Sequence, residues 1–232
     1  MAQTGRELEN HLGGAEATRY RDYQLSLIGP HLGDSVFEVG SGLGDFSAML
    51  TGARRLVVSD TDPICLDALR TRFGADPRVD VLEVDLDVPV TLPERVESVL
   101  AMNVLEHILD DVTALKELAE LLVPAGAVVL WVPAYPALYG DFDRLVGHHR
   151  RYTPATLRAT VEAAGLVPEL LKPVNLLGGI AWWAAVRRGG AGSASPRLVQ
   201  AYDRLVVPVT RAVERHWTPP FGQSLLCVAR RH

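Results

Sequence analysis

The sequence predicts an α/β fold in which helices cover both faces of a mostly parallel sheet. Three observations predict it. Apolar runs of strand length alternate with segments of helical periodicity between residues 36 and 132, which is typical of βαβ units. A glycine-rich turn follows the first apolar run, and Asp60, Asp85 and Asn103 each follow a later one. Because ligands bind at the carboxyl ends of parallel strands, the sequence also predicts a binding site at one edge of this sheet.

The individual elements can be assigned in order along the chain. Strands are expected at 36–39, 55–59, 79–84, 98–102 and 127–132, with helices at 45–50, 63–73 and 111–122. An aromatic and charged stretch, 135–152, then interrupts the alternation and is expected to lie on the substrate side. A helix at 154–164 follows, with Gly165 at its end. Residues 187–196 are rich in Gly, Ser and Ala and predict a flexible loop, and 224–229 predicts a last strand.

Composition limits the class of protein and its partners. The 232 residues suffice for one α/β domain, and 23 Lys and Arg against 28 Asp and Glu give a formal net charge of −5, which argues against nucleic acid as a partner. Cys65 and Cys227 lie far apart and belong to no metal-ligand cluster, so we expect a reducing compartment and no disulfide framework. We also expect no bound metal. The N-terminus lacks the apolar run of a secretory signal, and the longest apolar patch, 180–186, is too short to span a bilayer. A cytoplasmic protein is therefore expected, and a homodimer is compatible with the sequence.

The glycine-rich turn carries most of the information about a ligand. Gly40, Gly42 and Gly44 are spaced Gly-x-Gly-x-Gly, whereas the dinucleotide fingerprint is Gly-x-Gly-x-x-Gly. Glu38 and Asp45 flank the turn, and their negative charges would repel a pyrophosphate. A cationic nucleoside such as S-adenosylmethionine, with its sulfonium and ammonium groups, fits this turn better than NAD does. Glycine turns also occur as plain loop chemistry, so the turn alone leaves that alternative open.

Polar residues at the ends of the next strands fit the same ligand. Asp60 follows the second strand, about 20 residues after Gly40, where a ribose diol would lie in a nucleoside site. Asp62 is a rival for this role, although Asp62-Pro63 is also typical of a helix cap. Asp85 follows the third strand and could accept a hydrogen bond from adenine, or could be a solvated strand end.

These motifs together resemble a known family. The residues Glu38–Gly44, Asp60, Asp85 and Asn103–His107 match, in order and spacing, the class I S-adenosylmethionine-dependent methyltransferases over about residues 35–135. The later segments resemble a bacterial branch of that family that acts on diverse small molecules. The resemblance implies a Rossmann-like three-layer sandwich with a seven-stranded, mostly parallel sheet, an antiparallel last strand, an N-terminal helical lid and helical insertions on the substrate side.

The resemblance also implies a division of the single domain. Residues 1–34 would form the helical lid, 35–135 the cofactor-binding core, 136–218 the substrate-side insertion and cap helices, and 219–232 the last strand.

The same resemblance implies roles for particular residues. Glu38 and Gly40 would bind the methionine end of the cofactor, Asp60 the ribose hydroxyls, Asp85 with the Leu86 backbone the adenine, and Asn103 would lie near the sulfonium. The full expected cofactor set is Tyr20, Glu38, Gly40, Gly42, Gly44, Asp60, Thr61, Asp85, Leu86 and Asn103. Tyr20 belongs to this set because it lies on a helix that would cover the cofactor. The alternative is that Tyr20 packs on the sheet together with Tyr23.

Candidate catalytic residues come from the substrate side. Methyl transfer needs alignment, and a base only if the acceptor carries a proton. His107 and His148 have the ordinary pKa range for such a base, and Tyr152 is a weaker candidate because a phenol is a poor base at neutral pH. Each histidine could instead be a hydrogen-bonded structural group. Arg150 or Arg151 is expected to pair with an aspartate of the 135–152 stretch.

The predicted function is transfer of a methyl group from S-adenosylmethionine to an oxygen, nitrogen or carbon atom of a small molecule, with S-adenosylhomocysteine as product. Trp182 and Trp183 could make that acceptor site partly apolar, or could be simple packing residues. One alternative is another reaction of the sulfonium, either an intramolecular cyclisation or an aminocarboxypropyl transfer. A second alternative is a non-catalytic protein that binds S-adenosylmethionine.

Overall fold

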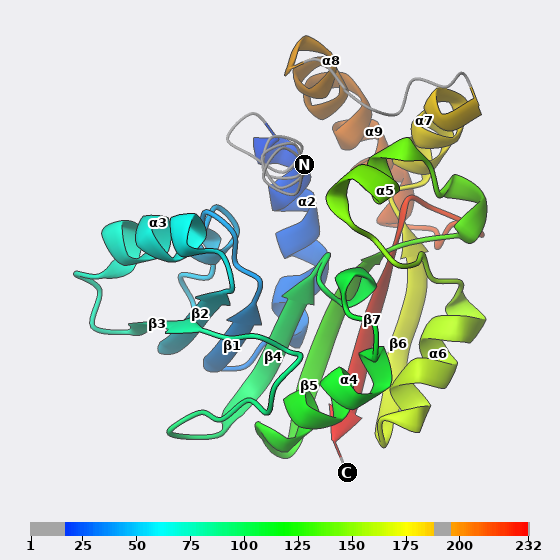
Figure 1. Cartoon of the computed structure of the whole chain (residues 1–232). Coiled ribbons are helices and arrows are strands. Elements are labelled where there is room, and N and C mark those ends of the chain that lie inside the picture. The colour runs from blue at the N-terminus through cyan, green and yellow to red at the C-terminus, as the bar shows by residue number, and fades with distance from the viewer. Residues whose placement is uncertain (1–16, 188–195, 232) are drawn as a thin grey trace.

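A seven-stranded sheet forms the centre of the protein (Figure 1). The computed structural model describes residues 17–187 and 196–231. The strands are β1 (Ser35–Val39), β2 (Arg55–Asp60), β3 (Val79–Glu83), β4 (Val96–Met102), β5 (Leu122–Pro133), β6 (Leu166–Val174) and β7 (Ser224–Arg231), in the spatial order β3-β2-β1-β4-β5-β7-β6. Strands β1 to β5 pair in parallel, whereas β7 is antiparallel to both β5 and β6. The predicted Rossmann-like sheet with an antiparallel last strand is confirmed.

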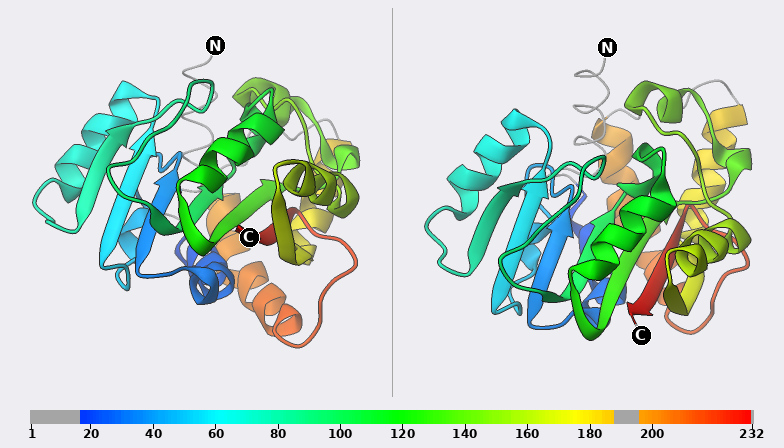
Figure 2. Two further views of the ribbon diagram at one scale, coloured as in Figure 1. Left: turned by 90° about the horizontal axis from the view of Figure 1, so that it is seen from below. Right: turned by 60° about the horizontal axis from the view of Figure 1, so that its bottom comes forward.

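Helices cover both faces of the sheet. They are α2 (Thr18–Ile28), α3 (Pro63–Phe73), α4 (Asp111–Glu120), α5 (Asp141–Val146), α6 (Pro154–Ala163), α7 (Leu176–Arg187), α8 (Pro196–Ala201) and α9 (Val207–Glu214), and a π-helical stretch, Tyr202–Val206, joins α8 to α9. Figure 2 shows α4 and α6 on one face of the sheet and α2 and α9 on the other. Within the described ranges, no helix has the length and apolar character needed to cross a membrane.

Each face buries its own apolar cluster. Leu115 and Leu118 of α4 pack with Leu157 of α6 on one side, and all three are buried. On the other side, Ile28 of α2 and Leu69 of α3 contribute to the second cluster. Burial of a leucine or isoleucine side chain stabilises a fold by roughly 1.5–3 kcal/mol. The sheet is thus fixed between two apolar layers, and its strand ends are free to carry polar groups.

The start of one helix and the end of another were predicted correctly from local sequence patterns. Asp62 caps α3, because its Oδ1 accepts a hydrogen bond from the Ile64 N–H at 2.8 Å and Pro63 occupies the first turn. Helix α6 ends before Gly165, which has a φ of 80°.

Other expectations were wrong or lie outside the described residues. The helix expected at 45–50 is a single 3₁₀ turn, Ser47–Met49. The backbone there forms hydrogen bonds of the 3₁₀ type, from the Met49 N–H to the Phe46 carbonyl and from the Leu50 N–H to the Ser47 carbonyl. Strand β5 begins at Leu122 instead of 127, because Leu122 already pairs with Val96. Residues 1–16 of the expected lid and 188–195 of the expected loop lie outside the described residues.

Candidate active site

Two positions in the glycine-rich turn after β1 require glycine. Gly40 and Gly44 have φ angles of 66° and 77°, in the left-handed region that disfavours side chains. A Cβ on Gly40 would lie 2.6 Å from Val104 Cγ2, and one on Gly44 would lie 2.7 Å from Phe73 Cε2. The turn therefore passes directly over the segment that follows β4 and against α3, and this contact joins the ends of three elements.

Hydrogen bonds tie this turn to the end of β2. The Gly42 N–H donates to Asp60 Oδ2 at 2.9 Å, and the Ser41 N–H donates to the Ser59 carbonyl at 2.7 Å. The other oxygen of Asp60 accepts a hydrogen bond from the Asp62 N–H at 2.9 Å. Asp60 thus points to the glycine turn, and a residue that binds a ligand on this turn must do so. Asp62, in contrast, caps α3.

Glu38 is a buried carboxyl beneath the same turn. Its side chain accepts a hydrogen bond from the Ser47 hydroxyl, and the residue is only 3% exposed. Burial raises the pKa of Glu38 to about 7, although the hydrogen bonds from Ser47 and Ser41 oppose that rise. A nearby cation would favour the ionised form, so this carboxyl is suited to an ammonium group.

We expect the raised pKa of Glu38 to make stability depend on pH. The folded protein holds the proton more tightly than the unfolded chain, whose carboxyl has a pKa near 4.5. The contribution is therefore complete below pH 4.5 and is lost as the pH rises to about 7, by about 3 kcal/mol in total. Urea unfolding across this range should show the loss in the wild-type protein and a flatter profile in Glu38→Gln. Parallel profiles would contradict the assignment.

Asp45 has a different role from the one its sequence position suggested. Its carboxylate lies 2.8 Å from the Arg72 guanidinium and 3.8 Å from that of Arg21. Its charge is therefore matched by two arginines within the protein.

The remaining expected cofactor residues lie at strand ends of the same sheet edge. Asn103 is exposed directly after β4 with a φ of 52°, and its N–H donates to the Trp131 carbonyl at 2.7 Å. Thr61 is exposed directly after β2. Asp85 is exposed beyond β3 and accepts a hydrogen bond from the Asp87 N–H at 2.9 Å, whereas Leu86 is buried.

The ring of Tyr20 packs on the sheet together with Tyr23, as the packing alternative predicted. Its ring stacks on Tyr23 at 6.1 Å and meets Trp131 of β5 edge-on at 6.4 Å. Burial raises the pKa of Tyr20 to about 12, partly offset by a hydrogen bond with Asn175. Helix α2 is thus packed on the sheet, and contact of Tyr20 with the cofactor stays a prediction.

Two candidate histidines, distant in sequence, meet beside the end of β4. The rings of His107 and His148 lie 4.7 Å apart, nearly perpendicular to each other. Glu106 is buried beside them, with Oε1 3.7 Å from His148 Nε2. On the other side of the ring, His148 Nδ1 lies 2.8 Å from Asp143 Oδ1. Sequence reasoning did not single out Glu106 or Asp143 as site residues, because only the fold brings α5 against the segment after β4.

The prediction of Tyr152 as a catalytic residue was wrong, because Tyr152 is a structural residue. It is 2% exposed, and its hydroxyl donates to Asp111 Oδ2 at 2.7 Å. Burial, together with this carboxylate, raises its pKa far above the ordinary value, so it cannot supply a phenolate. Arg150 pairs with the same Asp111 at 2.6 Å, and Arg151 pairs with Asp143 at 2.8 Å, the kind of ion pair that the sequence predicted.

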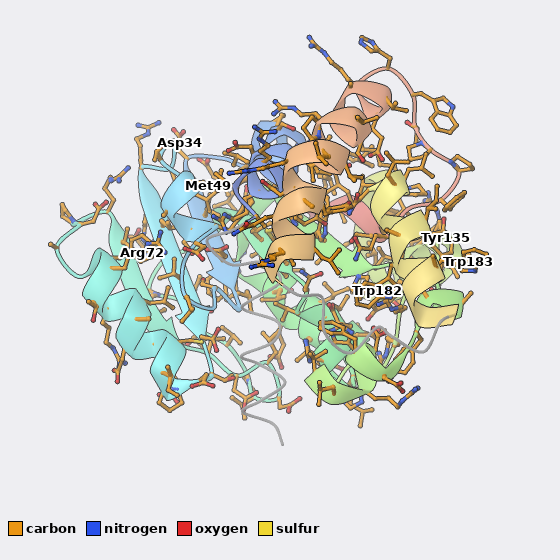
Figure 3. The ribbon with its side chains drawn as sticks, turned by 90° about the horizontal axis from the view of Figure 1, so that it is seen from above. Asp34, Met49, Arg72, Tyr135, Trp182 and Trp183 are labelled. Atoms are coloured by element: carbon orange, nitrogen blue, oxygen red, sulfur yellow. The ribbon has the colours of Figure 1, made fainter. Side chains whose placement is uncertain are left out.

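An apolar cavity of about 420 Å³ opens beyond the end of β5. It is lined by Tyr135, Ala137, Leu138, Gly179, Ile180, Trp183 and Phe221. Figure 3 shows Tyr135 beside Trp183 of α7. Trp182, in contrast, points to the other side of α7 and donates from Nε1 to the Leu138 carbonyl at 3.0 Å. A second hollow, about 460 Å³ and bordered by Lys116, Gly165 and Arg231, lies near the start of β5 and contains none of the candidate site residues.

The sheet order, the glycine turn and its link to Asp60 define the class I methyltransferase fold. Residues 37–128 match the family model described as a methyltransferase domain. This stretch of the chain therefore resembles a methyltransferase domain, and the fold around it is that of the class I S-adenosylmethionine-dependent methyltransferases.

Two solved structures resemble the chain in fold, and a curated protein resembles part of it in sequence. An S-adenosylmethionine-dependent methyltransferase from Mesorhizobium loti aligns with a TM-score of 0.60 and 19% identity, over 95% of this chain and 100% of that one. The N-methyltransferase NodS from Bradyrhizobium japonicum, solved with S-adenosylhomocysteine, gives a TM-score of 0.59 and 14% identity over 98% of both chains. A ribosomal protein L11 methyltransferase from Azotobacter vinelandii is 36% identical over 97 residues, which are 40% of this chain and 31% of that protein. The chain thus spans about a third of the length of this curated relative.

Proposed function

We propose that the protein transfers the methyl group of S-adenosylmethionine to an oxygen, nitrogen or carbon atom of a small molecule. The observation that carries the proposal is the hydrogen bond between the glycine turn and Asp60. This bond holds the Asp60 carboxylate, which would bind the ribose, beside the turn, and Glu38 lies beneath the same turn. One edge of the sheet therefore offers partners for both the hydroxyl groups and the ammonium group of this cofactor. Related structures with this fold include one solved with S-adenosylhomocysteine, which supports the choice of cofactor.

The chemistry requires little from the protein beyond alignment. A lone pair on the acceptor forms the new bond to the methyl carbon while the carbon–sulfur bond breaks, and its electrons stay on sulfur as a neutral thioether. Glu38 and Asp60 would hold the two ends of the cofactor, and Asn103 would lie near its sulfonium. Either His107 or His148, whose rings lie 4.7 Å apart, would remove the acceptor proton where the acceptor carries one.

The apolar cavity supports a small and partly apolar acceptor. Its volume is within the range of about 300–1,000 Å³ that small-ligand pockets occupy. The aromatic rings of Tyr135, Trp183 and Phe221 supply most of its apolar character. The acidic net charge of the chain gives no support to a nucleic-acid acceptor.

Calorimetric titration with S-adenosylmethionine and S-adenosylhomocysteine tests the proposal. We expect both to bind, and an absence of binding at millimolar concentration would contradict it. Mass spectrometry of products formed with a panel of small phenols and amines then identifies the reaction. S-adenosylhomocysteine together with a methylated acceptor supports methyl transfer. Methylthioadenosine would instead select the cyclisation or aminocarboxypropyl alternative, and binding without any turnover would select the non-catalytic alternative.

A further inference from the structure

Glu106, His107 and His148 form a cluster that the cofactor site does not use. Glu106 and His107 lie in the 3₁₀ turn Leu105–His107 after β4, and His148 follows α5. One ligand atom from each of the three side chains lies within 4.8 Å of the other two. We propose that these residues bind a divalent first-row transition metal, contrary to the absence of metal expected from sequence.

Burial and spacing both favour a metal ion. Glu106 is fully buried and His148 is 7% exposed, whereas His107 is half-buried. In a tetrahedral site with bonds of about 2.0–2.1 Å, neighbouring ligand atoms lie about 3.3 Å apart. The 3.7 Å between Glu106 Oε1 and His148 Nε2 is already close to that value. A small rotation of the half-buried His107 would bring the third ligand into place.

Asp143 fixes the orientation that His148 needs as a ligand. A hydrogen bond from His148 Nδ1 to Asp143 Oδ1, at 2.8 Å, turns Nε2 toward Glu106. Metal-binding histidines almost always donate their other nitrogen to such a carboxylate or carbonyl. Asp143 is itself held by Arg151, whose Nε lies 2.8 Å from the same Oδ1, so the carboxylate is fixed in place to orient the ring.

The donor set indicates which metals fit. Two imidazoles and one carboxylate suit Zn²⁺, Fe²⁺, Co²⁺ or Mn²⁺, whereas Mg²⁺ prefers oxygen ligands alone. Three protein ligands leave at least one coordination position open, as in catalytic zinc sites and unlike closed structural ones. Entry to that position is through His107, the most exposed of the three residues.

The open position also suggests a substrate class, and this step rests on the proposed function. The cluster begins three residues after Asn103, on the side where the acceptor would lie. A metal there would bind an acceptor hydroxyl and lower its pKa, so that the hydroxyl loses its proton to water. The oxygen then forms its bond to the methyl carbon as the carbon–sulfur bond breaks. The acceptor class is therefore an alcohol or phenol, methylated on oxygen.

The test begins with metal binding, which requires neither cofactor nor acceptor. Protein freed of metal with a chelator is titrated with Zn²⁺ by calorimetry and with Co²⁺ by visible absorption. We expect one equivalent to bind, with an intense Co²⁺ spectrum typical of low coordination number. Glu106→Gln and His107→Asn should each weaken Zn²⁺ binding by at least about tenfold. The matched control is His149→Asn, which changes an exposed neighbour outside the cluster and should bind as the wild type does.

Several outcomes would overturn the proposal. One is a Co²⁺ spectrum that remains that of the hydrated ion, which would leave the cluster as a metal-free network of His148 between two carboxylates. Another is Zn²⁺ binding that survives in both Glu106→Gln and His107→Asn, judged on variants whose circular dichroism matches the wild type. Binding of S-adenosylmethionine by the chelated protein is measured separately, so failure of the metal site and failure of the cofactor site are distinguishable.

Discussion

Replacement of Asp143 by asparagine is expected to lower the free energy of unfolding by about 3–5 kcal/mol. The Asp143 carboxylate is fully buried and is shared between three partners, Arg151, His148 and the Gly140 N–H. Asparagine keeps the shape but removes the charge, so the guanidinium of Arg151, whose side chain is 3% exposed, would remain buried without its counter-ion. Urea unfolding followed by circular dichroism measures the effect.

A matched control lies in the same helix. Asp141 pairs with Arg144, and both side chains are largely exposed, at 70% and 60%. Because exposed ion pairs contribute at most about 1 kcal/mol, Asp141→Asn should change stability by less than that amount. Equal effects of the two substitutions would show that the buried network around Asp143 does not stabilise α5.

Replacement of Asp60 by asparagine is expected to weaken S-adenosylmethionine binding by about 2–3 kcal/mol, or about 30- to 150-fold. The loss is expected because the substitution removes the negative charge, which would strengthen hydrogen bonds from the two ribose hydroxyls to Asp60. Asparagine still has a carbonyl oxygen that can accept from the Gly42 N–H, so the turn itself should persist. Calorimetry gives the dissociation constant for both proteins.

Asp62→Asn is the control for Asp60, since the two aspartates are rivals in sequence. Asparagine caps a helix about as well as aspartate, so α3 should be unaffected. We expect the affinity of Asp62→Asn for S-adenosylmethionine to stay within about twofold of wild type, in line with the small cost of replacing one cap by another. A larger loss in Asp62→Asn than in Asp60→Asn would reverse the assignment of the ribose-binding carboxylate.

Much of the cofactor half of the molecule could be predicted because its signals are local. Strand β1, the glycine turn and Asp60 follow one another closely, and their spacing determines which polar groups meet at the sheet edge. Helix α3 was predicted at its observed bounds because its capping residue, Asp62, and the proline of its first turn, Pro63, directly precede the helical pattern in the sequence. The helix expected after Gly44 was wrong because a few apolar residues at helical spacing do not distinguish a single 3₁₀ turn from an α-helix.

The acceptor half could not be predicted in the same way. Tyr152 had the residue type of a weak base, yet its pairing with Asp111 depends on a contact between segments 41 residues apart. For Tyr20 the sequence left two alternatives open, and its packing on Trp131 depends on a contact between residues far apart in the chain. Burial, which determines whether a phenol or carboxyl is reactive, is a property of the assembled fold.

The sequence by itself determined the sheet class, the glycine turn and the carboxylates at the strand ends, because each depends on residues near one another in the chain. Only the tertiary structure decided that His107 and His148 meet, that Glu106 lies beside them and that Asp143 orients one ring. The physical reason is that β4 and α5 come from distant segments, and their side chains converge only when β5 and the segment after it fold back along the sheet.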